Sequence, residues 1–132
     1  MESVMRGAKV MTLSEADIRY YRFEAVIRQK KELQELEERY ALAWNLARRA
    51  AKLLKEEFGA TRVVAFGSLL LRETFTPWSD VDIAAWGIPP LDTFRAIGEV
   101  MDLSTEIDIS LVDMATCKEP LKSTIQREGR EI

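Results

Sequence analysis

The chain contains no histidine and one cysteine, Cys117, among its 132 residues. The absence of histidine excludes Ser-His-Asp and Cys-His hydrolases and every zinc site that needs an imidazole. One cysteine can form neither an internal disulfide nor a zinc site by itself. Any bound metal must therefore be held by carboxylate and water oxygens, which are the ligands of Mg²⁺ or Mn²⁺.

Long apolar runs and an excess of basic residues are also missing. No stretch is apolar enough to span a bilayer, and the segment Met1–Arg6 lacks the apolar centre of a signal peptide. We therefore expect a cytoplasmic protein with no membrane contact. The net charge of −3 argues against general nucleic-acid binding, although a single nucleotide is not excluded. The length fits one globular domain.

Glycine and proline are absent from Ser14 to Phe58, and residues that favour helices dominate this span. Ser14 to Asp17 resembles a capping box, and Gly59 is suited to end the helix. An apolar seam is clearest in the second half, at Leu33, Leu36, Tyr40, Ala43, Ala47, Ala50 and Leu54. Residues 1–11 show no periodicity, so we expect them to fray.

One helix over this whole span would be about 65 Å long, which exceeds the size of a compact domain. It must therefore either break near Gln29–Glu32 or extend beyond the domain body. If it extends, Tyr20, Phe23 and Ile27 need cover from a protein partner or from self-association through this helix. We accordingly divide the chain into an N-terminal helical arm at residues 1–40 and a second domain at residues 41–132.

The stretch Val63–Ile83 carries the features that suggest chemistry. A β-branched, apolar run ends in Gly67-Ser68, where glycine lets a phosphate approach the backbone and the serine hydroxyl can donate a hydrogen bond. Asp80 and Asp82 follow on a second apolar run, where residues two apart share one face of a strand. Two such carboxylates repel each other unless a cation lies between them. Each motif alone is weak, because Gly-Ser turns and exposed Asp-x-Asp pairs are common.

The remaining chain alternates between segments with strand patterns and segments with helix patterns. We expect strands at 61–66, 81–86 and 106–112 and helices at 91–103 and 118–128, with a possible edge strand at 130–132. In the helix at 91–103, the spacing predicts a buried face made by Leu91, Phe94, Ile97 and Met101.

Asp108 lies in the middle of the third predicted strand, between two isoleucines. If this strand lies beside that of Asp80 and Asp82, three carboxylates converge and can hold one or two divalent metals. Asp108 is then a candidate metal ligand or proton acceptor. Glu106, on the same face, is the alternative for that role, and an edge residue facing water is the alternative for Asp108 itself.

Together these residues resemble the minimal nucleotidyltransferases of the DNA polymerase beta-like superfamily. The resemblance covers about residues 41–132 and rests on Phe66-Gly67-Ser68, Arg72, Pro77-x-Ser79-Asp80-x-Asp82-Ile83 and Asp108. It implies an α+β fold (an α/β mixed sheet) in which a small sheet is flanked by helices. It also implies that a nucleoside triphosphate such as ATP binds at Gly67, Ser68 and Arg72. It also implies Mg²⁺ or Mn²⁺ at Asp80, Asp82 and Asp108, and transfer of a nucleoside monophosphate to an acceptor hydroxyl. Similar proteins are often antitoxins that are paired with a small helical HEPN-type toxin, and some attach AMP to a tyrosine of the toxin.

The chain departs from the family pattern at Leu69–Glu73. The family commonly has a small residue and Arg-Gly after Gly-Ser, whereas this chain has one residue more and a glutamate, Glu73, after Arg72. Two alternatives therefore stay open beside AMP transfer to a partner. One is a non-catalytic, antitoxin-like binding module with a vestigial nucleotide site. The other is a nucleotidyltransferase for a small molecule, although no added substrate domain is present.

Overall fold

The structure is a computed structural model that describes residues 3–5, 8–10 and 14–132. It contains two compact units, Met1–Glu35 and Leu36–Ile132. In the first unit, the strands β1 (Ser3–Met5) and β2 (Ala8–Val10) pair antiparallel. The expected fraying of residues 1–11 is therefore wrong for these two strands, which are too short for periodicity to reveal. Residues 1–2, 6–7 and 11 lie outside the described part.

The helix α1 runs without interruption over Glu15–Phe58. The capping box is confirmed, because the Asp17 amide donates to Ser14 Oγ at 3.1 Å and the Ser14 amide donates to Asp17 Oδ2 at 3.3 Å. The alternative of a break near Gln29–Glu32 is wrong, since the helix continues through these residues, all of which favour helix. Gly59 ends the helix with a φ of 71°. No helix in the described ranges is long and apolar enough to cross a membrane.

The second unit is built on a four-stranded mixed sheet in the order β5-β4-β3-β6. The strands are β3 (Arg62–Phe66), β4 (Val81–Trp86), β5 (Ile109–Asp113) and β6 (Arg130–Glu131). β4 pairs antiparallel with β3 and parallel with β5, and β6 pairs antiparallel with β3. The predicted α+β fold with a mixed sheet and a long N-terminal helix is confirmed.

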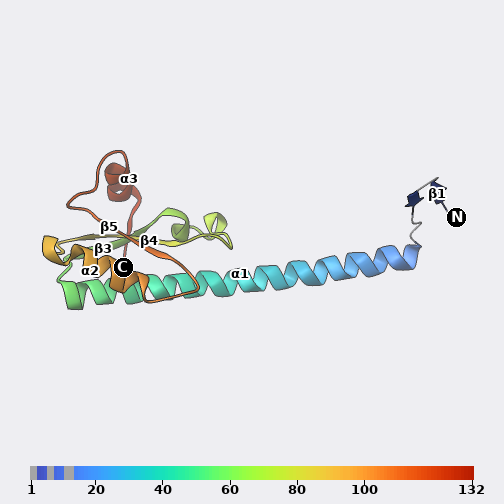
Figure 1. The fold of residues 1–132 in the computed structure, drawn as a ribbon, viewed down its shortest axis with the longest axis horizontal. Coiled ribbons are helices and arrows are strands. Elements are labelled where there is room, and N and C mark those ends of the chain that lie inside the picture. The colour runs from blue at the N-terminus through green and yellow to red at the C-terminus, as the bar shows by residue number, and fades with distance from the viewer. Residues whose placement is uncertain (1–2, 6–7, 11–13) are drawn as a thin grey trace. The chain divides into compact units, whose positions relative to one another are not determined.

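Helices cover both faces of this sheet (Figure 1). One face packs on the second half of α1 and on α2 (Thr93–Met101), and its core includes Ala47, Leu54 and Ile83. The opposite face packs on α3 (Leu121–Glu128) through a smaller cluster of Val64, Ala84, Met114 and Ile125.

The predicted buried face of α2 is wrong for three of its four residues, although Ile97 packs against the core. Leu91, Phe94 and Met101 are exposed, and Ile97 is half-buried. The core instead receives Ala96 and Val100, which have no exposed surface. The smaller side chains thus form the sheet side of α2, because spacing alone does not reveal which apolar face of a helix turns inward.

Two element boundaries in the structure also differ from the predicted ones. β5 begins at Ile109 rather than 106, because the Ser104 hydroxyl accepts the amides of Glu106 and Ile107 at 3.0 and 3.3 Å and turns the chain there. α3 begins at Leu121 rather than 118. The predicted edge strand after α3 is confirmed as β6.

Substitution of a buried leucine in α1 tests the packing of this helix. We expect Leu54→Ala, at a side chain with 0% exposure, to lower the free energy of unfolding by about 2–5 kcal/mol, because it leaves a cavity. The matched change Leu33→Ala, in the same helix but 57% exposed, should alter it by less than about 0.5 kcal/mol. Urea denaturation followed by circular dichroism measures both, and equal losses would contradict the packing described.

Candidate functional site

The turn after β3 lies directly against the β4 carboxylate. Gly67 follows β3 with a φ of 76°, in the left-handed region that favours glycine. A Cβ placed on Gly67 would lie 2.8 Å from Asp82 Oδ2, so a side chain at this position would collide with that carboxylate. Ser68, the next residue, is half-buried in the 3₁₀ turn η1 (Gly67–Leu70). The predicted proximity of the Gly-Ser turn and the Asp pair is thus present in the fold.

Asp80 and Asp82 lie where β4 begins. Asp80 is exposed just before the strand, and Asp82, half-buried, is the register partner of Phe66 on β3. Neither side chain makes an ion pair or a hydrogen bond with another residue in the part of the chain that the structure describes. Burial and the neighbouring Asp80 charge both raise the pKa of Asp82 above its ordinary value. An unneutralised carboxylate pair of this kind fits a hard divalent cation, which would relieve both effects.

Asp108 does not lie within a strand, contrary to the prediction. It is exposed and immediately precedes β5, and its carbonyl accepts the Val81 amide at 2.9 Å. The parallel register pairs Val81 with Ile109, so Asp80 and Asp108 are adjacent at the same edge of the sheet. Glu106, the alternative, is exposed in the turn before Asp108. Within residues 14–132, no three Asp, Glu or Cys side chains are arranged to hold a metal, so the third ligand is adjacent but not assembled.

Arg72 is turned toward α1. Its Nε donates to Glu37 Oε1 at 2.7 Å, and its guanidinium also forms a salt bridge with Glu37 and lies 5.6 Å from the centre of the Tyr40 ring. The hydrogen bond to Glu37 is the main cause that raises the pKa of Arg72. The sequence-predicted nucleotide contact of Arg72 therefore requires that it exchange Glu37 for a phosphate.

One turn of α1 holds three loops of the site, which the sequence analysis missed. The guanidinium of Arg39 donates to the carbonyl of Ser79 at 3.0 Å and to that of Glu106 at 3.3 Å. These carbonyls precede Asp80 by one residue and Asp108 by two. The Tyr40 hydroxyl donates to the Leu69 carbonyl at 3.0 Å and thereby fixes the turn after Gly67-Ser68. The only signal for Arg39 in the sequence is its place in the helix, between Leu36 and Tyr40 of the apolar seam.

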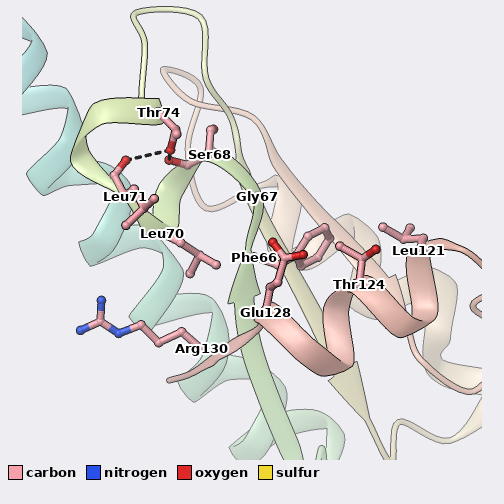
Figure 2. A pocket seen from close by; sticks show the side chains of 10 residues that line it. All are labelled: Phe66, Gly67, Ser68, Leu70, Leu71, Thr74, Leu121, Thr124, Glu128 and Arg130. Atoms are coloured by element: carbon pink, nitrogen blue, oxygen red, sulfur yellow. Dashed lines mark hydrogen bonds between the residues drawn. The ribbon is translucent and has the colours of Figure 1, made fainter.

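A pocket of about 890 Å³ lies beside the Gly-Ser turn, between this turn and α3 (Figure 2). This volume lies within the usual range of about 300–1,000 Å³ for small-molecule sites. Its walls are mainly apolar, with two charged residues at one end, and consist of Phe66, Gly67, Ser68, Leu70, Leu71, Thr74, Leu121, Thr124, Glu128 and Arg130. Arg130 is itself held 5.1 Å from the Trp44 ring centre. The pocket can therefore accept a largely apolar group.

Neutralising Asp82 should stabilise the metal-free protein. We expect Asp82→Asn to raise the free energy of unfolding at pH 7 in EDTA, because it removes a half-buried charge. The folded pKa lies above the ordinary value of 3.8, so this advantage is full at pH 7 and disappears as the pH falls through the folded pKa toward 3.8. Asp80→Asn should give a smaller gain, since it removes only the second cause. Denaturant unfolding at several pH values measures this, and a less stable Asp82→Asn at pH 7 would contradict it.

Loss of the Arg39 guanidinium should loosen the loops before Asp80 and Asp108. We expect Arg39→Ala to lower the free energy of unfolding by about 1–3 kcal/mol, because two charge-assisted hydrogen bonds are lost. Amide hydrogen exchange should also accelerate around Val81 and Ile107. Arg28→Ala, at an exposed position of the same helix, is the control and should leave both readouts unchanged. An equal effect of the two substitutions would refute the role of Arg39.

Comparisons with known proteins show the family and the fold of this chain. The profile of the family described as nucleotidyltransferase domain matches residues 47–130, which is more than half of the chain. No curated protein sequence matches the chain. A chain of a toxin–antitoxin complex crystallised with AMP-PNP is similar in fold, with 20% identity and a TM-score of 0.53 over 64% of this chain and 70% of that one. A chain from the complex of the tri-AMPylated Shewanella oneidensis HEPN toxin with its MNT antitoxin has 18% identity and a TM-score of 0.50 over 67% and 70%. The chain described here belongs to the nucleotidyltransferase domain family.

Proposed function

We propose that the protein transfers AMP from ATP to a hydroxyl group of a protein partner, a HEPN-type toxin. The observation that carries this proposal is the contact between the Gly67 turn and Asp82, at which a Cβ would lie 2.8 Å from the carboxylate. It brings a turn suited to phosphate next to a carboxylate pair suited to a metal. The domain that performs this reaction comprises residues 41–132 together with the preceding turn of α1.

Each residue has a distinct task in this proposal. Gly67 and Ser68 bind the triphosphate, because glycine permits close approach and the serine hydroxyl can donate to a phosphate oxygen. The 890 Å³ pocket beside them receives the nucleoside. Arg72, released from Glu37, adds a positive charge to the phosphates. Its exposed salt bridge with Glu37 is weak enough to be exchanged for a phosphate contact.

In this proposal the carboxylates would hold Mg²⁺ or Mn²⁺ and receive the proton of the acceptor hydroxyl. Asp80 and Asp82 would bind the cation, which when present supplies positive charge that stabilises the transferring phosphoryl group. The acceptor oxygen forms a bond to the α-phosphorus, and the bond from this phosphorus to the pyrophosphate oxygen breaks. Asp108 takes the hydroxyl proton or joins the metal ligands, and both roles suit its position beside Asp80. Arg39 is a positioning residue, because it acts only through the loops that carry Asp80 and Asp108.

Exposed apolar surface supports a protein acceptor. Large exposed side chains of α1, including Tyr20, Phe23 and Ile27, provide apolar surface that a helical partner can cover. The similar complexes with AMP-PNP and with an AMPylated HEPN toxin support the same class of reaction.

A non-catalytic binding module is the second candidate. It is favoured by the bond between Arg72 and Glu37 and by the third carboxylate, Asp108, which is not assembled with the other two. In this version the protein masks its partner sterically, and neither ATP nor the carboxylates are needed.

Intact-mass measurement separates the two. We expect the full chain, incubated with ATP, Mg²⁺ and the co-purifying partner, to add the mass of one or more AMP groups to the partner. Asp82→Ala should reduce this transfer by at least about 10²-fold, because the remaining groups cannot hold the metal alone. Arg39→Lys is the comparison variant. It should retain part of the activity, because it changes a positioning residue and leaves the proposed metal ligands in place. No added mass with the wild type, with partner binding retained by Asp82→Ala, would sink the enzymatic proposal and favour the binding module.

A further inference from the structure

Arg72 does not line the pocket that its neighbours line. The turn η2 (Arg72–Thr74) comes shortly after the Gly-Ser turn, and Leu70, Leu71 and Thr74 all contribute to the wall of the 890 Å³ pocket (Figure 2). Arg72, which lies between them in the sequence, is not part of this wall. It is the only cationic residue in the stretch 67–74, so no other side chain of this segment can offer a positive charge to a phosphate.

A single turn of α1 holds the Arg72 side chain instead. Oε1 of Glu37 accepts a hydrogen bond from Arg72 Nε at 2.7 Å and also forms the salt bridge with Nη2. The central carbon of the guanidinium lies 5.6 Å from the centre of the Tyr40 ring. Glu37 and Tyr40 are three residues apart, so they are neighbours on one face of the helix and contact the guanidinium together. The Nε–Nη2 edge of Arg72 is therefore turned toward α1.

This contact opposes phosphate binding in two ways. The Nε–Nη2 edge is one of the guanidinium edges that can bind a phosphate through two parallel hydrogen bonds, and Glu37 occupies it. The Glu37 charge also neutralises that of Arg72, and Glu73 beside it leaves the three side chains with a net negative charge. A residue that presented Arg72 to a phosphate would instead hold it at the pocket wall, where its neighbours lie.

We propose that Glu37 is an autoinhibitory residue, which holds Arg72 away from the pocket until a triphosphate displaces it. The inference rests on the proposed function, since it requires that the triphosphate binds at the Gly-Ser turn and is contacted by Arg72. Displacement is feasible because the pair is accessible, with the Glu37 side chain 62% exposed and that of Arg72 31% exposed. The helix α1 thus limits the affinity for the nucleotide through one carboxylate, in addition to holding two loops of the site through Arg39.

Calorimetric titration of the full chain with ATP and Mg²⁺ tests the proposal. Glu37→Gln keeps the length of the side chain and removes its charge, so this variant should bind ATP about threefold to fivefold more tightly than the wild type. Glu32→Gln, at an exposed residue of the same helix, removes the same charge away from Arg72 and should bind ATP like the wild type. Both substitutions exchange one helix-favouring residue for another, so the circular dichroism spectrum should not change.

A double-mutant cycle tests whether Glu37 acts through Arg72. Arg72→Gln alone should weaken ATP binding, because the phosphate contact is lost. In the Arg72→Gln background, Glu37→Gln should change the affinity by less than about twofold, since no guanidinium remains to be released. A gain as large as that in the wild-type background would mean that Glu37 acts on the phosphates directly, and would overturn the proposal.

The titrations also separate this proposal from the proposed function. If ATP binds to the wild type and to Glu37→Gln equally, or more weakly to Glu37→Gln, the autoinhibitory role is overturned and the transferase proposal stands. If ATP binds to neither protein, both are overturned. Tighter binding to Glu37→Gln, with Glu32→Gln unchanged, supports both.

Discussion

The hydrogen bonds from Arg39 to the carbonyls of Ser79 and Glu106 hold the candidate site together. The loops before β4 and β5 have no regular structure of their own where Asp80 and Asp108 occur. A planar guanidinium with several donors can bind two carbonyls at once, whereas a lysine could not do so with the same geometry. One residue of α1 thereby determines how the two loops lie relative to each other. The site depends on this helix even though α1 supplies none of the proposed ligands.

The negative charges of the site lower the stability of the metal-free fold. Asp82 is half-buried, close to Asp80 and without a cationic partner among residues 14–132, and its raised pKa reflects this cost. A residue kept for stability would be paired or exposed instead. Such local destabilisation is common where a protein binds a charged ligand, because the ligand removes the cost when it binds. Arg72 is the opposite case, since its charge is already neutralised by Glu37 in the absence of a ligand.

The predictions for α2, Asp108 and Arg39 failed because the local sequence did not distinguish between two possible arrangements. The spacing in α2 identified a real apolar stripe, but Ala96 and Val100 on the other side formed a second one, and packing against the sheet selected the smaller side chains. Asp108 was expected in a strand because alternation begins at Glu106. The Ser104 hydroxyl instead captures the backbone there and delays the strand. Arg39 was missed because a charged helical residue usually faces solvent, and its partners are distant in the sequence.

The sequence alone determined the helical character of Ser14–Phe58, the three main strand segments and the presence of a Gly-Ser turn followed by two aspartates that can only be oxygen ligands. Each of these follows from local chemistry: the lack of glycine and proline, the β-branched runs, and the missing histidines that leave only oxygen ligands. Only the tertiary structure decided that Gly67 contacts Asp82, that Asp108 lies beside Asp80, and that Arg39 joins their loops. These are contacts between segments far apart in the chain, and they depend on strand register and helix packing, which no local pattern encodes.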